Sequence, residues 1–302
     1  MPFKLVIVGS GSAVPTLQRA VTSQYLNFNE RRILIDCGEG TQLQLRKYGV
    51  RFQRLQYIFI SHLHGDHFLG IFGLVASMSL LGRTQKLIIF APEGLEKMVR
   101  LQFELSKVYL DFELEFQTIQ CKEKTLIFED RLLEVFAFPL KHRIECYGFL
   151  FKEKPKELNI NKDQIEKYEI TLAEIWAIKN GAALERNGQL IPNEALTLPP
   201  AHRLSYAFCT DTKYYEKITE WVQGVDLLYH EATFIEKQTD RAKATMHSTA
   251  KQAAEIAQKA QVKRLILGHF SARFANTLEL HAEAKTIFEN VTCVEDGDTF
   301  DL

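Results

Sequence analysis

The chain has little of what marks secreted or membrane proteins. Its cysteines are scattered, odd in number and never spaced as Cys-x-x-Cys, which predicts reduced, structural thiols in a cytoplasmic protein. No window approaches roughly 18 uninterrupted apolar residues, so we expect no membrane span. The first residues, MPFKLVIVGSG, lack the long apolar stretch of a signal peptide and are typical of a first strand.

The chain also lacks a charge excess of either sign. It holds 37 Lys and Arg against 38 Asp and Glu, for a net charge of −1. This balance excludes a basic field over the whole molecule, so a nucleic-acid partner would have to be held by a local patch. The 302 residues are enough for a large core, as one large domain or as two halves of roughly 150 residues.

Short apolar runs recur along the chain, and each stops at a polar or proline-containing cluster. They are rich in β-branched and aromatic residues, which predicts buried strands. A helical pattern is clearest at 248–260, where alanines and Ile256 share one face. We therefore predict an α/β protein with buried sheets, in which ligands gather at strand ends. The runs cover residues 3–9, 31–40, 55–67, 85–92, 132–143, 204–212, 225–234 and 262–271.

Residues 152–200 differ from the rest of the chain. The strand pattern lapses there, and the segment is charged, with Asn-Gly turns and a Pro-Pro exit. We expect a single domain over residues 1–302, with 152–200 inserted as a surface arm. Segments of this length are usually functional or disordered.

The stretch SHLHGDH at residues 61–67 holds three of the nine histidines. On an extended strand end, His62 and His64 point to the same side. Gly65 would then let the chain turn, so that Asp66 and His67 are presented to a neighbouring point. One open site cannot use all four side chains, so the stretch predicts two metal ions, about 3.5–4 Å apart.

The remaining ligands must come from other strand ends. His142, Asp211 and His269 each follow an apolar run, and an aspartate can bridge two divalent ions. Imidazole and carboxylate are zinc ligands, and catalytic zinc sites keep one position open for water. The alternative is a hydrogen-bonded polar cluster without metal. It does not account for four ligand-type residues in six positions together with three more at strand ends.

HLHGDH has the HxHxDH pattern of the metallo-β-lactamase superfamily. Other motifs follow in an order and spacing that resemble the ribonuclease Z family, endonucleases that remove 3′ trailers from precursor tRNA. The resemblance runs from about residue 3 to the C-terminus, and HEATF, MHST and GHFSARF are its most specific parts. The motifs are GSGSAVPT (9–16), DCGEGTQ (36–42), FPLKHR (138–143), CTDT (209–212), HEATF (230–234), MHST (246–249) and GHFSARF (268–274).

This resemblance implies a four-layer αββα sandwich of the α/β class, with an inserted arm that binds substrate. It implies a zinc-dependent endoribonuclease that leaves a 3′-hydroxyl on the tRNA and a 5′-phosphate on the trailer. Two Zn²⁺ ions per chain are implied, or other divalent ions such as Mn²⁺. A cytoplasmic homodimer is also implied, in which the arm of one subunit clasps tRNA at the active site of the other. The implied ligands are His62, His64 and His142 at one site, and Asp66, His67 and His269 at the other, with Asp211 shared.

Phosphodiester hydrolysis needs an activated water, neutralised phosphate charge and a proton for the leaving oxygen. Asp66 lies among the ligands and can take the proton of the water. His247 precedes a helix on which Thr249 and Gln252 form a capping box, and a helix N-terminus favours a nearby anion. We expect His247 to protonate the departing 3′ oxygen and Glu231 to orient it. The alternative, an incidental surface histidine, is disfavoured by the MHST resemblance.

Substrate contacts are expected close to the ligands and at the root of the arm. Ser271 and Arg273 follow His269, and a guanidinium binds phosphate bidentately. Arg143, beside His142, is expected near the 3′ end of the substrate. A basic row at the arm root is expected to contact tRNA phosphates, and it consists of Lys152, Lys154 and Lys156.

Several other residues are not expected to act in the chemistry. GSGSAVP has a Gly-x-Gly but no third glycine, and Pro15 interrupts the helix that dinucleotide binding requires. Asp36 is expected to brace the metal loop and not to bind metal. His202 and His281 match no motif and are expected at the surface. His230 is expected in the core or behind the metal site.

The arm departs from the family pattern, in which bacterial arms usually carry a Gly-Pro-rich motif. The corresponding stretch, EITLAEIWAIKNG (169–181), has none, and residues 152–200 hold seven Lys and Arg against eight Asp and Glu. Two other functions therefore stay open. A metallo-hydrolase of small or cyclic phosphodiesters would gain little from a tRNA body. A non-catalytic RNA-processing subunit would be expected to have lost ligands, whereas all seven are present.

Overall fold

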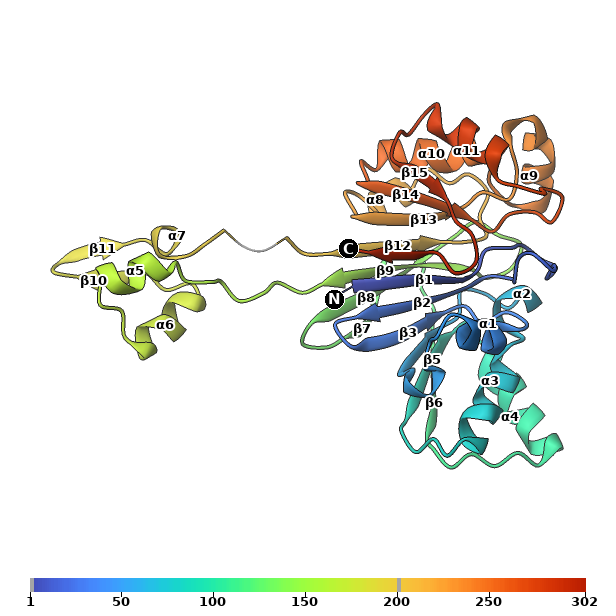
Figure 1. Cartoon of the computed structure of the whole chain (residues 1–302), viewed down its shortest axis with the longest axis horizontal. Helices are drawn as coiled ribbons and strands as arrows, with labels where there is room; N and C mark the ends of the chain where they lie inside the picture. Colours follow the sequence, from blue (N-terminus) through green and yellow to red (C-terminus); the bar gives the residue numbers. More distant parts are fainter. Residues whose placement is uncertain (1–2, 200–201) are drawn as a thin grey trace.

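The computed structural model describes residues 3–199 and 202–302. Two seven-stranded sheets pack face to face, and helices cover the outer face of each (Figure 1). The predicted α/β class and the four-layer αββα arrangement are confirmed. Within the described ranges, no helix has both the length and the apolar character needed to cross a membrane.

The first sheet forms the half of the sandwich at the bottom of Figure 1. Its strands are β1 (Phe3–Gly9), β2 (Ser23–Phe28), β3 (Arg31–Ile35), β4 (Tyr57–Phe59), β5 (Leu87–Ala91), β6 (Leu114–Thr118) and β16 (Thr299–Asp301). The helices of this half are α1 (Thr41–Lys47), η1 (Phe52–Arg54), α2 (Gly65–Phe68), α3 (Ile71–Leu80) and α4 (Leu95–Ser106). The strand order is β16-β1-β2-β3-β4-β5-β6, and the strands from β3 to β6 are parallel.

The second sheet carries the other half of the site. Its strands are β7 (Thr125–Glu129), β8 (Leu133–Pro139), β9 (Tyr147–Glu153), β12 (Ser205–Cys209), β13 (Leu227–Glu231), β14 (Arg264–Gly268) and β15 (Val291–Cys293). The helices over it are α8 (Ile218–Trp221), η2 (Glu236–Gln238), α9 (Thr239–Thr245), α10 (Ala250–Lys259) and α11 (Leu278–Lys285). The order is β15-β14-β13-β12-β9-β8-β7, with β12 to β15 parallel.

Every predicted apolar run contains a strand. The runs are apolar throughout because successive side chains of a strand point to opposite faces, and both faces of each sheet are buried. On β12, Tyr206 and Phe208 lie in the core between the sheets, whereas Ala207 and Cys209 face the helices. Burying each large apolar side chain of this kind stabilises the fold by roughly 1.5–3 kcal/mol. The alanine face of α10 is buried against the second sheet, so this helix packs closely on it.

Parallel strands bring their carboxyl ends to one edge of each sheet, and the two edges meet at the end of the sandwich on the right of Figure 1. Asp36 follows β3 and His62 lies beyond β4 in the first sheet. Asp211 and His269 follow β12 and β14 in the second. The candidate ligands of both halves therefore share one end of the molecule.

The segment between β9 and β12 projects from the opposite end of the sandwich (Figure 1). It contains α5 (Lys162–Lys167), α6 (Leu172–Lys179), β10 (Leu184–Arg186), β11 (Gln189–Ile191) and α7 (Asn193–Leu196). The β10–β11 hairpin turns at Asn187 and Gly188, both with positive φ. Lys152 still belongs to β9, and Pro200, the last residue of the expected arm, lies outside the described residues.

The arm has a small core of its own. Its capping box, Thr171 with Glu174, starts α6, and Arg186 pairs with Glu174 at 2.8 Å. Glu153 and Leu204 are hydrogen-bonded at the root, so the two ends of the arm leave the sandwich side by side. The arm is thus packed separately from the sandwich. Its buried apolar residues are Ile170, Ile178, Leu184, Ile191 and Leu196.

Ile178→Ala should loosen the arm and leave the sandwich intact. Truncating a buried isoleucine lowers the free energy of unfolding by about 2–5 kcal/mol. This is a large loss for the arm, because its core is small. Hydrogen exchange should speed up across the arm, while β9 and β12 keep their protection. Trp176→Ala is the matched control, because Trp176 lies on the same helix and is 72% exposed. Loss of protection in the sandwich strands would contradict a separate arm core.

Candidate active site

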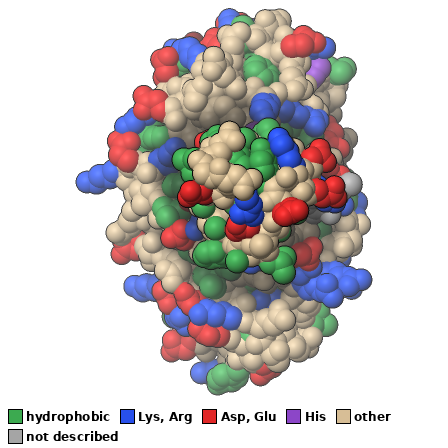
Figure 2. Space-filling view, turned by 90° about the vertical axis from the view of Figure 1, so that its left-hand side faces the viewer, with side chains coloured by type: hydrophobic (Ala, Val, Ile, Leu, Met, Phe, Trp, Pro, Cys, Tyr) green, Lys and Arg blue, Asp and Glu red, His purple; other side chains and the backbone are tan. Residues whose placement is uncertain are grey.

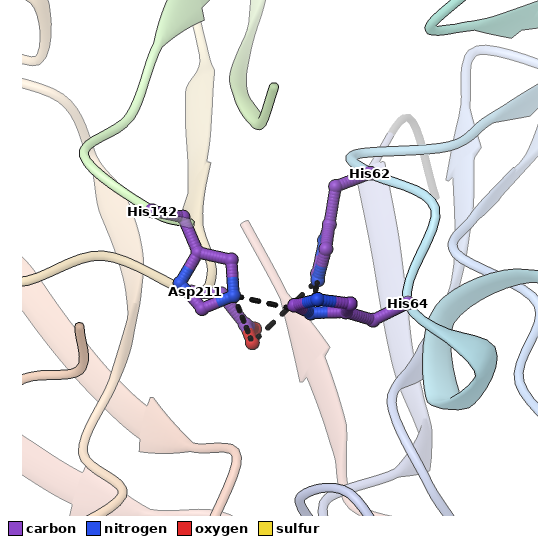
Figure 3. A group of neighbouring side chains, drawn as sticks. All are labelled: His62, His64, His142 and Asp211. Atoms are coloured by element: carbon purple, nitrogen blue, oxygen red, sulfur yellow. Dashed lines mark hydrogen bonds and ion pairs between the residues drawn. The ribbon is translucent and has the colours of Figure 1, made fainter. Parts of the chain in front are cut away.

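Three histidines and one aspartate meet at the centre of the site (Figure 3). His64 Nδ1 lies 3.1 Å from His62 Nε2 and 3.1 Å from His142 Nε2. Asp211 Oδ2 lies 3.6 Å from His62 Nε2 and 3.7 Å from His142 Nε2. Four potential donor atoms from three different loops thus surround one point.

A second group lies on the other side of Asp211. His67 Nε2 and His269 Nε2 lie 3.4 and 3.6 Å from Asp66 Oδ2. Asp211 Oδ1 lies 3.2 Å from His67 Nε2 and 3.1 Å from His269 Nε2. Asp211 therefore turns one carboxylate oxygen toward each group, which is the position of a bridging ligand.

Buried hydrogen bonds fix the rings of His62 and His67. The Asp36 carboxylate accepts hydrogen bonds from Ser61 Oγ at 2.8 Å and from His67 Nδ1 at 2.7 Å. Because the Ser61 hydroxyl donates its only proton to Asp36, it must accept from His62 Nδ1, 3.0 Å away. His62 thus carries its proton on Nδ1 and presents an Nε2 lone pair to the site. Burial lowers the pKa of His67, but Asp211, Asp66 and Asp36 outweigh it and raise that pKa, so a cation bound at its Nε2 would displace a proton.

The second sheet fixes His142 and His269 in the same way. Thr233 Oγ1 donates to Glu231 Oε2 at 2.6 Å, so it accepts from His269 Nδ1 at 2.9 Å. His142 Nδ1 donates to the carbonyl of Met246 at 3.1 Å. These partners again leave Nε2 as the free acceptor.

The donor set fits divalent cations. Nε2 of His67 and Nε2 of His269 are buried and make no hydrogen bond among the described residues. Burial lowers the pKa of His62 and of His142, so both favour the neutral form that binds metal. Burial raises the pKa of Asp66, but His67 and His269 outweigh it and hold that pKa below its ordinary value. Neutral imidazoles and ionised carboxylates are the ligands that zinc takes.

His247 stands beside this cluster and is held by a buried carboxylate. Its Nδ1 lies 2.9 Å from Glu231 Oε1, and Glu231 also accepts from the backbone amide of Thr212. Burial alone would lower the pKa of His247, but the Glu231 carboxylate outweighs it and raises that pKa to about 9. The capping box predicted for Thr249 and Gln252 is present. His247 is therefore positioned as a proton carrier at the edge of the cleft.

The backbone at the site adopts unusual conformations. Ala13, Asp36, Met246 and His269 all have φ between 56° and 61°, the left-handed region that disfavours side chains. Each such residue costs on the order of 1–3 kcal/mol. Gly65 is not among them: the chain passes from the extended backbone of His64 into α2 at Gly65, so the change of direction there needs no positive φ. The strain lies on residues that hold or carry the donor atoms.

Two adjoining hollows meet at His247. The first, about 450 Å³, is lined by members of the donor cluster, which comprises the seven candidate ligands of the two groups. It is also lined by Arg143, whose guanidinium donates to the carbonyl of Ala244. The second, about 420 Å³, is lined by Ser271 and Arg273, together with Arg241, which the motifs did not single out. The cleft therefore has room on both sides of His247.

The sequence did not single out several residues that shape the site. The amide of Ala13, in the GSGSAVP stretch, donates to Asp66 Oδ2 at 2.7 Å. Ser61, Thr233 and the Met246 carbonyl orient ligand-type histidines. Asp36 braces His67, as expected.

The remaining predicted residues lie away from the cleft. His202 is exposed and pairs with Asp226, His281 is half-buried, and His230 lies in the core. The basic row lies at the arm end of β9, where Lys154 pairs with Glu129. The structure does not bring this row near the donor cluster.

Comparison with known proteins shows the family to which the chain belongs. Ribonuclease Z of Parabacteroides distasonis is 45% identical over 296 residues, which cover 98% of this chain and 97% of that protein. Ribonuclease Z of Bacteroides thetaiotaomicron is 47% identical, over 95% of this chain and 91% of that protein. The family model described as anti-Pycsar protein Apyc1 matches residues 3–292, so the chain also belongs to the family of that description.

Solved structures agree with this placement. Human tRNase Z, short form, superposes with a TM-score of 0.71 at 29% identity, over 99% of this chain and 98% of that one. The metallo-β-lactamase fold protein YhfI from Bacillus subtilis gives a TM-score of 0.70 at 18% identity, over 99% of both chains, and supports the fold alone. The chain belongs to the ribonuclease Z family and has the metallo-β-lactamase fold.

Proposed function

We propose that this chain is a metal-dependent endoribonuclease that removes the 3′ trailer from precursor tRNA. It leaves a 3′-hydroxyl on the tRNA and a 5′-phosphate on the trailer. One observation carries the chemistry: Asp211 joins two donor groups, and the His247–Glu231 pair stands beside them. The names ribonuclease Z and tRNase Z of its relatives favour a tRNA substrate over a small or cyclic diester.

The donor groups are the proposed sites of two divalent ions, with zinc as the first choice and Mn²⁺ as an alternative. Bound there, the ions would neutralise phosphate charge and lower the pKa of water. One would be held by His62, His64 and His142, and the other by Asp66, His67 and His269, with Asp211 shared.

The residues of the chain divide the proton transfers between them. Asp66 is ionised and held by the Ala13 amide, so it can accept the proton of the attacking water. As the bond between phosphorus and the 3′ oxygen breaks, His247 gives its Nε2 proton to that oxygen, which becomes the 3′-hydroxyl of the tRNA. Glu231 keeps the opposite ring nitrogen, Nδ1, protonated and fixes the direction of the ring.

Cations around the cleft are placed to hold the neighbouring nucleotides. Ser271 and Arg273 line the hollow beyond His247 and are proposed to bind phosphate. Arg143 lines the hollow that contains the donor cluster, and we assign it to the 3′ end of the substrate. Arg241 joins Arg273 as a second guanidinium in the same hollow.

The arm cannot serve the active site of its own chain directly. β9 begins five residues after His142 and ends at the root of the arm, so its seven residues separate the two by roughly 20 Å. The arm then points away from the cleft (Figure 1). This geometry supports a homodimer, which we propose to be cytoplasmic, in which the arm of one subunit holds tRNA for the other.

Exposed apolar side chains support a contact between subunits on the first sheet's helices. They lie at the end of α3, on one face of α4 and in the loop that follows α4. This loop lies against the end of α3, because Ser79 Oγ donates to the carbonyl of Tyr109. Sedimentation of the intact protein as a monomer at micromolar concentration would argue against this dimer. The side chains are Leu80, Leu81, Leu101, Leu105 and Tyr109.

Asp66→Ala and His247→Ala should both lower the cleavage rate by about 100-fold or more, since general acid–base groups contribute on that order. The two variants should differ in metal content. His247→Ala should keep both ions, because His247 contacts Glu231, whereas Asp66→Ala should bind less metal. Single-turnover cleavage and metal analysis check this. Near-normal cleavage by His247→Ala would remove it as the proton donor, and a lost ion would make it a ligand.

Deleting residues 155–203 behind a short Gly-Ser linker should separate tRNA binding from chemistry. Glu153 and Leu204 lie side by side, so the linker closes the gap without distorting the sheet. The variant should hydrolyse a small chromogenic phosphodiester at the normal rate, but its KM for precursor tRNA should rise at least about 10-fold, because remote phosphate contacts are lost.

The matched substrate for the intact enzyme is the same trailer without its tRNA body, which should be a poor substrate. Equal cleavage of the two RNAs, or unchanged tRNA processing by the deletion variant, would favour the small-diester alternative.

A further inference from the structure

The three lysines at the arm root are not equivalent. Lys154 lies 2.5 Å from Glu129, and Lys156 lies 2.8 Å from the buried carboxylate of Glu153. Both ammonium groups are thus engaged by carboxylates of the sandwich. Lys152 has no such partner among the described residues. The basic row therefore reduces to a single free cation.

Lys152 instead belongs to a different group of cations. It lines a hollow of about 320 Å³ together with Lys124, which immediately precedes β7, and Arg203, from the segment that enters β12. The apolar floor includes Leu150 and Trp221. The register of the sheet explains the grouping, because Lys152 pairs with Ser205, two residues beyond Arg203. Three segments distant in sequence thus converge.

The lining of the hollow holds more cations than carboxylates, although Glu134 lies opposite Lys152 in the register of β8 and β9. Within the described ranges, Lys124, Lys152 and Arg203 form no ion pair, and Glu220 is the only carboxylate in the lining. Burial and the neighbouring Lys152 both lower the pKa of Lys124. His202 lies at the rim but is already bonded to Asp226 at 2.5 Å. The three cations repel one another, and a bound anion would relieve that repulsion. The net charge of the whole chain is only −1, so this cluster is a local feature.

We propose that Lys124, Lys152 and Arg203 form a binding site for backbone phosphates of the tRNA, at the root of the arm and remote from the catalytic cleft. The proposal rests on the proposed function and adds a contact point to it.

Exposure favours a polymer over a small phosphate compound. Lys124 and Arg203 are exposed, whereas a small-molecule pocket usually encloses 70–90% of its ligand. Lys152 and Arg203 lie at the end of the sandwich from which the arm projects, since the arm connects β9 to β12 (Figure 1). Figure 2 shows Lys and Arg side chains around the arm on this side, interspersed with Asp and Glu. RNA held by the arm would pass this surface on its way to the partner's cleft.

The test is a triple variant, Lys124→Ala, Lys152→Ala and Arg203→Ala. The KM for precursor tRNA should rise about 10-fold or more with kcat within 2-fold, since the lost contacts are remote from the scissile bond. The dependence of log KM on log salt should become shallower by about two, because each phosphate contact contributes nearly one. Hydrolysis of a small chromogenic phosphodiester should not change.

The matched control removes the same charge elsewhere. Arg46, Arg51 and Arg54 are exposed, form no ion pair among the described residues and lie in the other half of the sandwich, outside the proposed subunit contact. Their triple alanine variant should keep the normal KM and salt dependence. Equal behaviour of the two triple variants would overturn the site, and circular dichroism confirms that both fold.

Two further outcomes are distinct. If the unmodified enzyme does not cleave precursor tRNA at all, the proposed function fails. If tRNA processing is unchanged but inorganic pyrophosphate binds the unmodified enzyme at micromolar concentration and not the triple variant, the site serves a small phosphate compound. That result would overturn the RNA assignment.

Discussion

The layer of hydrogen bonds behind the histidines is the constraint on which the rest of the structure depends. Asp36 with Ser61 in one sheet, and Glu231 with Thr233 in the other, hold ring protons on the outward nitrogens. The inward nitrogens then face a buried space, where those of His67 and His269 have no hydrogen-bond partner among the described residues. A site built in this way is unfavourable when empty, because buried acceptors without donors lose hydration. It becomes favourable when cations occupy it, so the fold is arranged around the metals it is proposed to bind.

This constraint explains why two sheets are needed and why the arm is independent of them. Each donor group combines residues from both sheets through Asp211, so the sandwich must be rigid to keep them in register. Left-handed residues such as Asp36 and His269 are tolerated because hydrogen bonds on both sides determine their positions. The arm, by contrast, needs reach and not precision. Its core is separate, so the substrate binding that we propose for the arm can vary without disturbing the ligands.

The sequence predicted the parts of the site that depend on order along the chain. His62, His142, Asp211 and His269 follow apolar runs, and strand ends of parallel sheets meet, so their convergence could be foreseen. The strand β9 was not predicted, because YGFLFKE continues without a break into the charged segment.

What could not be predicted depends on contacts between distant segments. Nothing local to Thr233 or to the Met246 carbonyl shows that either orients a histidine. The same holds for charge: Lys154 and Lys152 look alike in sequence, but only the structure shows that Glu129 engages the first. Net charge along the arm was therefore a poor guide to where phosphate could bind.

The account is tested most directly by calorimetric titration of the metal-free protein with Zn²⁺. It predicts two ions per chain. It also predicts the effect of Thr233→Val, which keeps every ligand but removes the hydroxyl that orients His269. This variant should bind one of the two ions with an affinity lowered by about 10–100-fold. Saturation at one ion per chain would contradict the account, as would a Thr233→Val variant that binds both ions with unchanged affinity.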